Sequence, residues 1–310
     1  MEFITSQHRY YTLNYYLKKR FKKKVFKVAL NGNFTCPNRD GSISTKGCIF
    51  CSEKGSGDFA GNVEDSLQDQ FNMVKNIIHQ KWKDALYIAY FQANTNTYAP
   101  LSRLKKLYEE AISLDENIVA LSIATRPDSI SDEVIEYLGE LNKKIPVWIE
   151  LGLQTIHQKT DNFINRGYTL DVFHKAVNNL RKHNIEVIVH VINGLPYETK
   201  EMMLDTIKYL NTLDIQGIKI HSLYILENTI LGQIYQSNPF KVLSLDEYVD
   251  IVTEQLAILR PDIVIHRISG DAPKDQLLAP LWGMKKFVVM NEINKEMKRR
   301  DYFQGCKYKS

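Results

Sequence analysis

Three of the four cysteines in this chain lie close together, in a stretch rich in glycine and polar residues. Eleven residues separate Cys36 from Cys48, and two separate Cys48 from Cys51. Three thiolates are one ligand short of a closed four-coordinate metal site. A [4Fe–4S] cluster held by three cysteines keeps one iron open to another ligand, whereas a structural zinc ion needs a fourth side chain.

The zinc interpretation requires a fourth ligand from elsewhere in the chain. His8, His79, His157 and Cys306 are available, but none lies at the spacing of a zinc finger or zinc ribbon. The cysteine count alone leaves zinc and a cluster equally open. The context favours a cluster, because structural zinc normally stabilises a small module with little core, whereas this loop follows the first strand of a large array. Cys306 is expected to be a reduced thiol in a mobile tail.

The array consists of short β-type runs that alternate with amphipathic helical patterns. The runs cover residues 25–30, 86–91, 118–124, 146–151, 186–192, 217–223 and 263–268. One intervening helix begins at about residue 63, one is capped by Ser131, one begins near Thr199, and one opens with the capping box of Ser244 and Glu247.

Repeated βα units with short links predict an α/β protein with a parallel sheet. This many units in one direction favour a partial TIM-type (β/α)6 barrel, with residues 263–268 as a seventh strand. The barrel core is expected over residues 25–270, after a basic, aromatic N-terminal segment (1–24). A C-terminal helical extension with a disordered basic tail is expected over residues 271–310.

Polar residues follow the predicted strands at their carboxyl ends, where βα barrels carry their chemistry. Their placement, together with the thiols, predicts an active site on that rim of the barrel. They include Gln92, Asn94, Thr125, Arg126, Asp128, Gln154, Asn193 and His221. Phe50, directly before Cys51, suits either a contact with a bound adenine or packing into the barrel mouth.

Basic residues are concentrated near both ends of the chain, although the formal net charge is only +4. Near the N-terminus they follow four tyrosines and surround Phe21; they are Lys18, Lys19, Arg20, Lys22, Lys23 and Lys24. Basic residues interleaved with aromatics suit contacts with phosphates and stacked bases. A solvated face is the alternative interpretation.

The compartment is predicted to be the cytoplasm. The N-terminus lacks a basic region followed by an apolar run, so it does not read as a signal peptide. No apolar run approaches the ~18 residues that span a bilayer. Four cysteines in 310 residues cannot form a disulfide framework, which fits a reducing environment.

The cysteine loop after the first strand of a partial βα barrel resembles that of the radical S-adenosylmethionine (SAM) superfamily, over roughly residues 20–270. The long first spacing departs from the common C-x3-C-x2-C form and is similar to the catalytic subunit of Elongator and its bacterial relatives. Further matching stretches are residues 125–128, 150–155, 165–168 and 192–198. The sequence most resembles compact bacterial Elongator-like proteins without the acetyltransferase domain.

The resemblance implies that Cys36, Cys48 and Cys51 hold a [4Fe–4S] cluster and that SAM binds its open iron to yield a 5′-deoxyadenosyl radical. The implied cofactor-binding residues are Phe50, Gln92, Asn94, Thr125, Glu150, Gln154, Arg166, Asn193 and Gly194. The residues expected to face substrate are Arg126, Asp128, Lys219, His221 and His266.

The Elongator likeness points to the C5 side chain of the tRNA wobble uridine as the substrate. It implies tRNA and an electron donor of flavodoxin or ferredoxin type as partners. One alternative is a radical SAM enzyme for a small molecule such as a tetrapyrrole precursor. Another is a non-catalytic, zinc-stapled RNA-binding protein.

Overall fold

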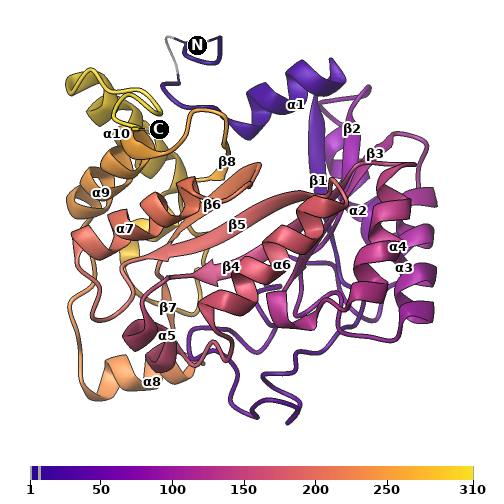
Figure 1. Cartoon of the computed structure of the whole chain (residues 1–310), viewed down its shortest axis with the longest axis horizontal. Helices are drawn as coiled ribbons and strands as arrows, with labels where there is room; N and C mark the ends of the chain where they lie inside the picture. The colour runs from indigo at the N-terminus through magenta and orange to yellow at the C-terminus, as the bar shows by residue number, and fades with distance from the viewer. Residues whose placement is uncertain (1, 6–7, 310) are drawn as a thin grey trace.

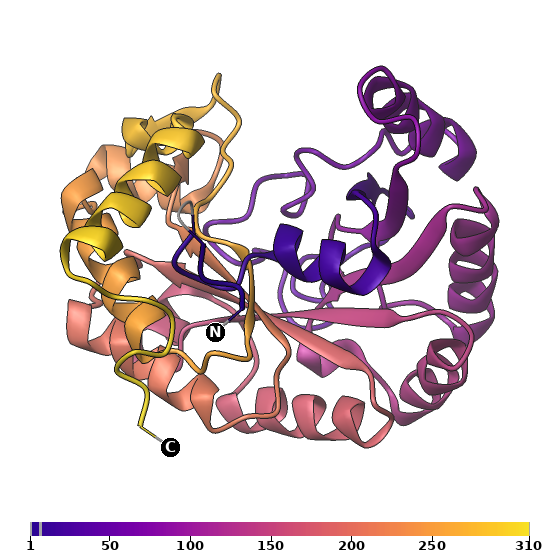
Figure 2. The same cartoon turned by 90° about the horizontal axis from the view of Figure 1, so that it is seen from above.

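Seven parallel strands form one curled sheet, a half-barrel with helices on its outer side (Figures 1 and 2). The computed structural model describes residues 2–5 and 8–309. The order across the sheet is β1 (Val25–Leu30), β2 (Leu86–Phe91), β3 (Ile118–Thr125), β4 (Val147–Gln154), β5 (Glu186–Asn193), β6 (Gly217–Ser222) and β8 (Val264–Arg267). The predicted partial barrel and its seventh strand are confirmed.

Helices α2 (Leu67–His79), α3 (Leu101–Ser113), α4 (Asp132–Asn142), α6 (Leu170–Lys182), α7 (Lys200–Asn211) and α9 (Leu245–Ile258) follow successive strands and cover the outer face of the sheet. Most of them begin at a Ser or Thr whose side chain accepts a backbone N–H, as N-caps do. Ser131 caps α4, and Ser244 and Glu247 form the expected capping box on α9. The first of these helices begins at Leu67 rather than near residue 63, because Ser66 is its cap.

The N-terminal segment contains a helix that the sequence did not predict, α1 (Leu13–Phe21). Its buried Leu17 packs with Trp148 and Ile188, which point into the barrel from β4 and β5. Arg20 pairs with Glu186 at the start of β5 at 2.5 Å. Helix α1 therefore covers the amino end of the barrel, as Figure 2 shows from that side.

Further elements lie around the carboxyl end of the barrel and along one side. They are α5 (Gln158–Ile164), α8 (Ile230–Ser237), the antiparallel pair β7 (Ile225–Leu226) and β9 (Leu277–Ala279), two short 3-10 helices (Pro127–Ser129 and Leu281–Met284) and α10 (Lys286–Arg299). Within the described residues, no helix is long and apolar enough to cross a membrane.

The described residues after α10, 300–309, pack against the rest of the chain, which corrects the expectation of a disordered tail there. Backbone N–H groups of Gly305 and Lys307 donate to carbonyls of α9 at 3.1 and 2.8 Å. The side chain of Gln304 is fully buried: it accepts from the Tyr11 N–H at 2.8 Å and donates to the carbonyls of Arg260 and Ile263 at 2.9 and 2.8 Å. One amide thus joins both ends of the chain to the turn before β8.

We expect Gln304→Ala to lower the free energy of unfolding by about 2–3 kcal/mol, because it leaves buried backbone groups without partners. Urea unfolding followed by circular dichroism measures the change. The exposed Gln80 at the end of α2 provides the control, since its replacement by Ala leaves no buried polar group without a hydrogen-bond partner. Equal effects of the two variants would show that the Gln304 contacts do not hold the two ends.

Candidate functional site

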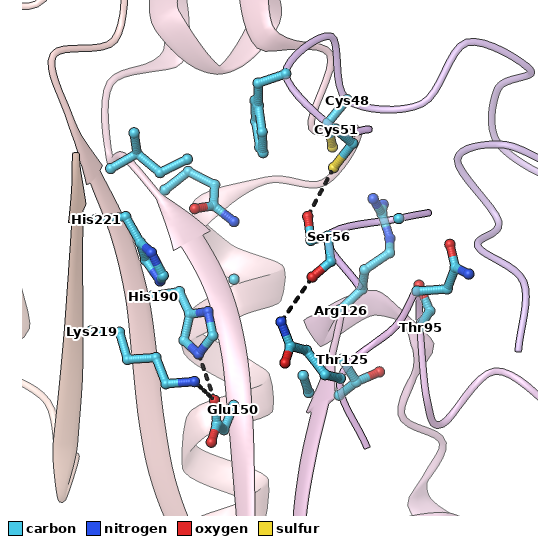
Figure 3. Close-up of a pocket in the computed structure, with 18 of the residues that line it drawn as sticks. Cys48, Cys51, Ser56, Thr95, Thr125, Arg126, Glu150, His190, Lys219 and His221 are labelled. Atoms are coloured by element: carbon cyan, nitrogen blue, oxygen red, sulfur yellow. Dashed lines mark hydrogen bonds and ion pairs between the residues drawn. The ribbon is translucent and has the colours of Figure 1, made fainter. Parts of the chain in front are cut away.

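A cavity of about 280 Å³ opens at the carboxyl ends of the strands. The cysteine loop forms one wall, and side chains from the inner face of the barrel form the floor (Figure 3). Cys36, Cys48 and Cys51 all line it, so the structure brings the three thiols to the predicted rim.

Two side-chain amides that follow β2 attach the cysteine loop to the end of that strand, and Arg39 joins two parts of the loop. Gln92 Nε2 donates to the Ser56 carbonyl at 3.0 Å, and Asn94 Nδ2 donates to the Phe34 carbonyl at 3.0 Å. Arg39 donates to the Glu53 carbonyl at 2.7 Å. These bonds fix the loop backbone through groups that are not thiols.

Asn38 connects the loop to the segment after α5. Its fully buried Nδ2 donates to the Asn165 carbonyl at 2.7 Å and lies 3.6 Å from Cys48 Sγ. Asn165 in turn donates to the Gly47 carbonyl at 2.7 Å. Asn38 is a positioning residue that the sequence analysis missed, because an Asn in a polar loop carries no distinctive pattern.

Two of the thiols interact directly. A hydrogen bond from Cys48 is the largest cause that lowers the pKa of Cys51 to about 7, while the same contact and burial raise the pKa of Cys48. Ser56 Oγ lies 3.4 Å from Cys51 Sγ. Among the described residues, no three His, Cys, Asp or Glu side chains converge where one metal ion would fit.

The floor of the cavity centres on one buried carboxylate, that of Glu150 on β4. It accepts hydrogen bonds from Lys27 on β1 and Lys219 on β6, from Ser122 Oγ at 2.7 Å and from His190 Nε2 at 2.8 Å. Its side chain has no exposed area. Burial alone would raise the pKa of Glu150, but Lys219, Lys27 and His190 hold it well below its ordinary value.

The same burial disfavours the charged forms of the basic floor residues. It lowers the pKa of Lys219 to about 7, against the opposing effect of Glu150, and Lys27 and Arg267 lower it further. Burial, followed by the charge of Lys219, lowers the pKa of His190 to about 4. His190 is therefore neutral at pH 7, and its Nε2 must carry the proton that it donates to Glu150.

Ten of the residues predicted to bind cofactor or substrate line this cavity: Phe50, Gln92, Asn94, Thr125, Arg126, Glu150, Gln154, Arg166, Lys219 and His221. Two arginines among them already have partners. Arg166, 2% exposed, donates to the carbonyls of Thr155 and Tyr168 at 2.8 and 3.0 Å and lies 2.8 Å from Asp161. Arg126 pairs with Asp128 through two hydrogen bonds of 2.9 and 2.6 Å.

The remaining four lie outside the cavity lining. Asn193 exchanges hydrogen bonds with Gln255 of α9 at 2.7 and 2.9 Å, because alternation along β5 turns His190 and Ile192 inward and Asn193 outward. Gly194, with φ +86°, packs against Leu243 beside a separate cavity. Asp128 serves as the partner of Arg126.

His266 is the fourth of these residues. It packs against Trp148, with ring centroids 5.7 Å apart, and faces a pocket at the amino end of the barrel. Its neighbour Arg267 lines the cavity instead.

The basic N-terminal residues lie at the opposite end of the barrel from the thiols. Figure 1 shows α1 at the start of β1, with the cysteine loop after the far end of that strand. Several of the charges are engaged locally: Lys19 pairs with Glu2 at 2.6 Å, Arg20 pairs with Glu186, and Lys24 donates to Asn14 at 2.5 Å. The structure does not bring this segment to the cavity.

The sequence analysis missed several lining and floor residues, namely Lys27, Tyr90, His190, Tyr224 and Arg267. Three of them stand in mainly apolar strand runs: Lys27 in VFKVAL, His190 in EVIVHVI and Arg267 in IVIHRI. A charged or titratable residue inside such a run is a usable signal, because the inward positions of a half-barrel with a cavity are the places that tolerate it.

A curled βα half-barrel with three thiols and an aromatic side chain at its carboxyl rim is the architecture of radical SAM enzymes. Residues 39–210 match the model of the Radical SAM superfamily, and residues 215–299 match that of the Radical SAM C-terminal domain. The chain belongs to the radical SAM superfamily. The cofactors of this family are a [4Fe–4S] cluster and SAM.

Individual relatives place the chain near Elongator-type proteins. It is 49% identical over 303 residues to the uncharacterized protein YtqA of Bacillus subtilis, covering 98% of this chain and 94% of that protein. It is 26% identical to the tRNA uridine(34) acetyltransferase of Methanocaldococcus jannaschii, over 66% of this chain and 37% of that protein. The fold matches archaeal Elp3 of Methanocaldococcus infernus with a TM-score of 0.67 and 18% identity, over 91% of this chain and 64% of that one.

We expect Glu150→Gln to lower the free energy of unfolding at pH 7 by about 3–5 kcal/mol, because it leaves Lys27 and Lys219 buried without their counter-charge. Because the pKa of Glu150 is lower in the folded protein, its contribution is complete above its ordinary pKa and is lost as the pH falls through the folded value. Urea unfolding at pH 7 and under acid conditions measures both effects. Replacement of the exposed Glu140 of α4 by Gln is the matched control, and a loss of stability no larger than that of this control would contradict the assignment.

Proposed function

We propose that this protein is a radical SAM enzyme that modifies the C5 side chain of the wobble uridine of tRNA. The observation that carries the proposal is the alignment of two thirds of the chain with a protein named for tRNA uridine(34). The match of the fold to that of archaeal Elp3 supports the same proposal. The lined cavity with three thiols at its mouth supplies the place for the chemistry.

In this proposal Cys36, Cys48 and Cys51 would hold the cluster and leave one of its irons open to SAM. With an electron from the reductant, the two cofactors would supply radical chemistry that starts with removal of a hydrogen atom from the substrate. The chain provides the positions and limits access of water. Phe50, Gln92, Asn94, Thr125 and Gln154 are the proposed SAM contacts, since they line the cavity beside or opposite the thiols.

Partners and location follow from the same proposal. A reductant of flavodoxin or ferredoxin type would deliver the electron to the cluster, in the cytoplasm. The wobble base would enter at the cavity mouth. The basic residues of α1, at the other end of the barrel, would then contact only a part of the tRNA that lies away from its anticodon.

We expect anaerobically purified protein to be brown and to contain about four irons per chain. Single replacements of Cys36, Cys48 or Cys51 by Ala should reduce iron to less than about one per chain, while Cys306→Ala should retain it. Iron analysis and the visible absorption spectrum measure this. A colourless protein with zinc bound through the same three cysteines would favour the zinc-stapled alternative.

We expect tRNA from cells that lack the gene to show an altered wobble-uridine profile, with one C5-substituted nucleoside lost and its precursor accumulated. Mass spectrometry of digested tRNA measures the change. The wild-type gene should restore the profile, and a Cys48→Ala copy should not. If the profile is unchanged while the purified enzyme still cleaves SAM to 5′-deoxyadenosine under reduction, the substrate is a small molecule instead.

A further inference from the structure

The cavity floor carries more positive charge than the carboxylates beside it neutralise. Glu150 is shared by Lys27 and Lys219. Asp271 is shared by Arg267 at 3.2 Å and Lys286 at 3.0 Å. Four basic side chains therefore share two carboxylates, and Asp58 of the cysteine loop is a further carboxylate in the cavity lining.

This excess is costly because the floor is buried. The side chains of Lys219, Lys27 and Arg267 are 9%, 16% and 32% exposed. A buried charge without a counter-charge raises the free energy of the folded state unless something pairs with it. The lowered pKa values of Lys27, Lys219, His190 and His221 have burial as their largest cause, and neighbouring positive charge adds to it in each.

On the side of the cysteine loop, Arg39 also lines the cavity and donates to backbone carbonyls of that loop. On the opposite wall, Arg126 pairs with Asp128 and Arg166 with Asp161. Lys219, His190 and His221, in contrast, point from β6 and β5 into the space below Cys48 and Cys51 (Figure 3). Arg267 and Tyr90 line the same space, and the Tyr90 hydroxyl lies 3.1 Å from Lys219 Nζ.

We propose that the floor formed by Lys219, Arg267 and His221 binds an oxyanion of the substrate, either a carboxylate or a phosphate. An oxyanion there gains charge-assisted hydrogen bonds from Lys and Arg donors. It would hold the adjoining part of the substrate beneath the thiol-lined mouth. The inference rests on the proposed function, because it names the chemical class that the same cavity receives.

The test measures binding without turnover. Acetate and inorganic phosphate are titrated separately into anaerobic holoenzyme with SAM bound, at ionic strength held constant with chloride, by isothermal titration calorimetry. We expect saturable binding of at least one anion, weakened about tenfold or more in Lys219→Met and in Arg267→Gln, which each remove one charged donor. Acetate alone would assign a carboxylate, and phosphate alone a phosphate.

Two matched controls remove similar charges at exposed side chains: the variants Lys208→Met on α7 and Arg299→Gln on α10 should bind the anions as the wild type does. Two floor variants are tested because either of them could fail to fold, and the other would then still decide the outcome. The proposal is overturned if neither anion binds, or if both floor variants bind as the controls do.

This result is independent of the tRNA experiment. Anion binding together with an unchanged tRNA profile would reject the wobble uridine and retain an acidic small molecule as substrate. A changed profile without anion binding would retain the tRNA substrate and reject the role of the floor.

Discussion

The carboxylate of Glu150 is the contact on which the interior of the half-barrel depends. Side chains from β1, β3, β5 and β6 converge on its two oxygens, so one residue on the central strand links five of the seven strands by hydrogen bonds within the cavity. A barrel interior filled only with aliphatic side chains would be easier to stabilise, but it would leave no polar chamber. Inside this barrel, the layer nearer the amino ends of the strands, formed by Ile88, Trp148 and Ile188, is apolar. The layer nearer the carboxyl ends, around Glu150, is charged.

The interior of the barrel therefore changes from apolar to charged along the direction of the strands. Toward the amino end, α1 and its Leu17 complete an apolar closure. Toward the carboxyl end, the loops carry the cysteines and the amide side chains that anchor them. The carboxyl end therefore holds the groups to which the proposed chemistry is assigned, and the buried Gln304 joins segments at the opposite end.

The sequence predicted most of the sheet because each strand is a short β-branched or aromatic run between polar turns. It predicted the thiol rim because the carboxyl ends of parallel strands meet at one edge. It missed α1, because that helix buries only Leu17 and is otherwise basic and aromatic. It wrongly placed Asn193 in the site. The sequence shows that Asn193 ends a strand, but it does not show whether that side chain points into the barrel or away from it. Gln304 could not be foreseen, because its three partners are distant in sequence.

The anchoring of the cysteine loop separates folding from cofactor loading. In small zinc modules the metal supplies the folding free energy, so the protein without metal is unfolded. In this chain the bonds of Asn38, Arg39, Gln92 and Asn94 hold the loop through backbone carbonyls. The position of the loop is therefore defined by hydrogen bonds that need no metal. A cluster bound by this loop would enter a place that the protein backbone already outlines, which is the reverse of a zinc module that the metal itself shapes.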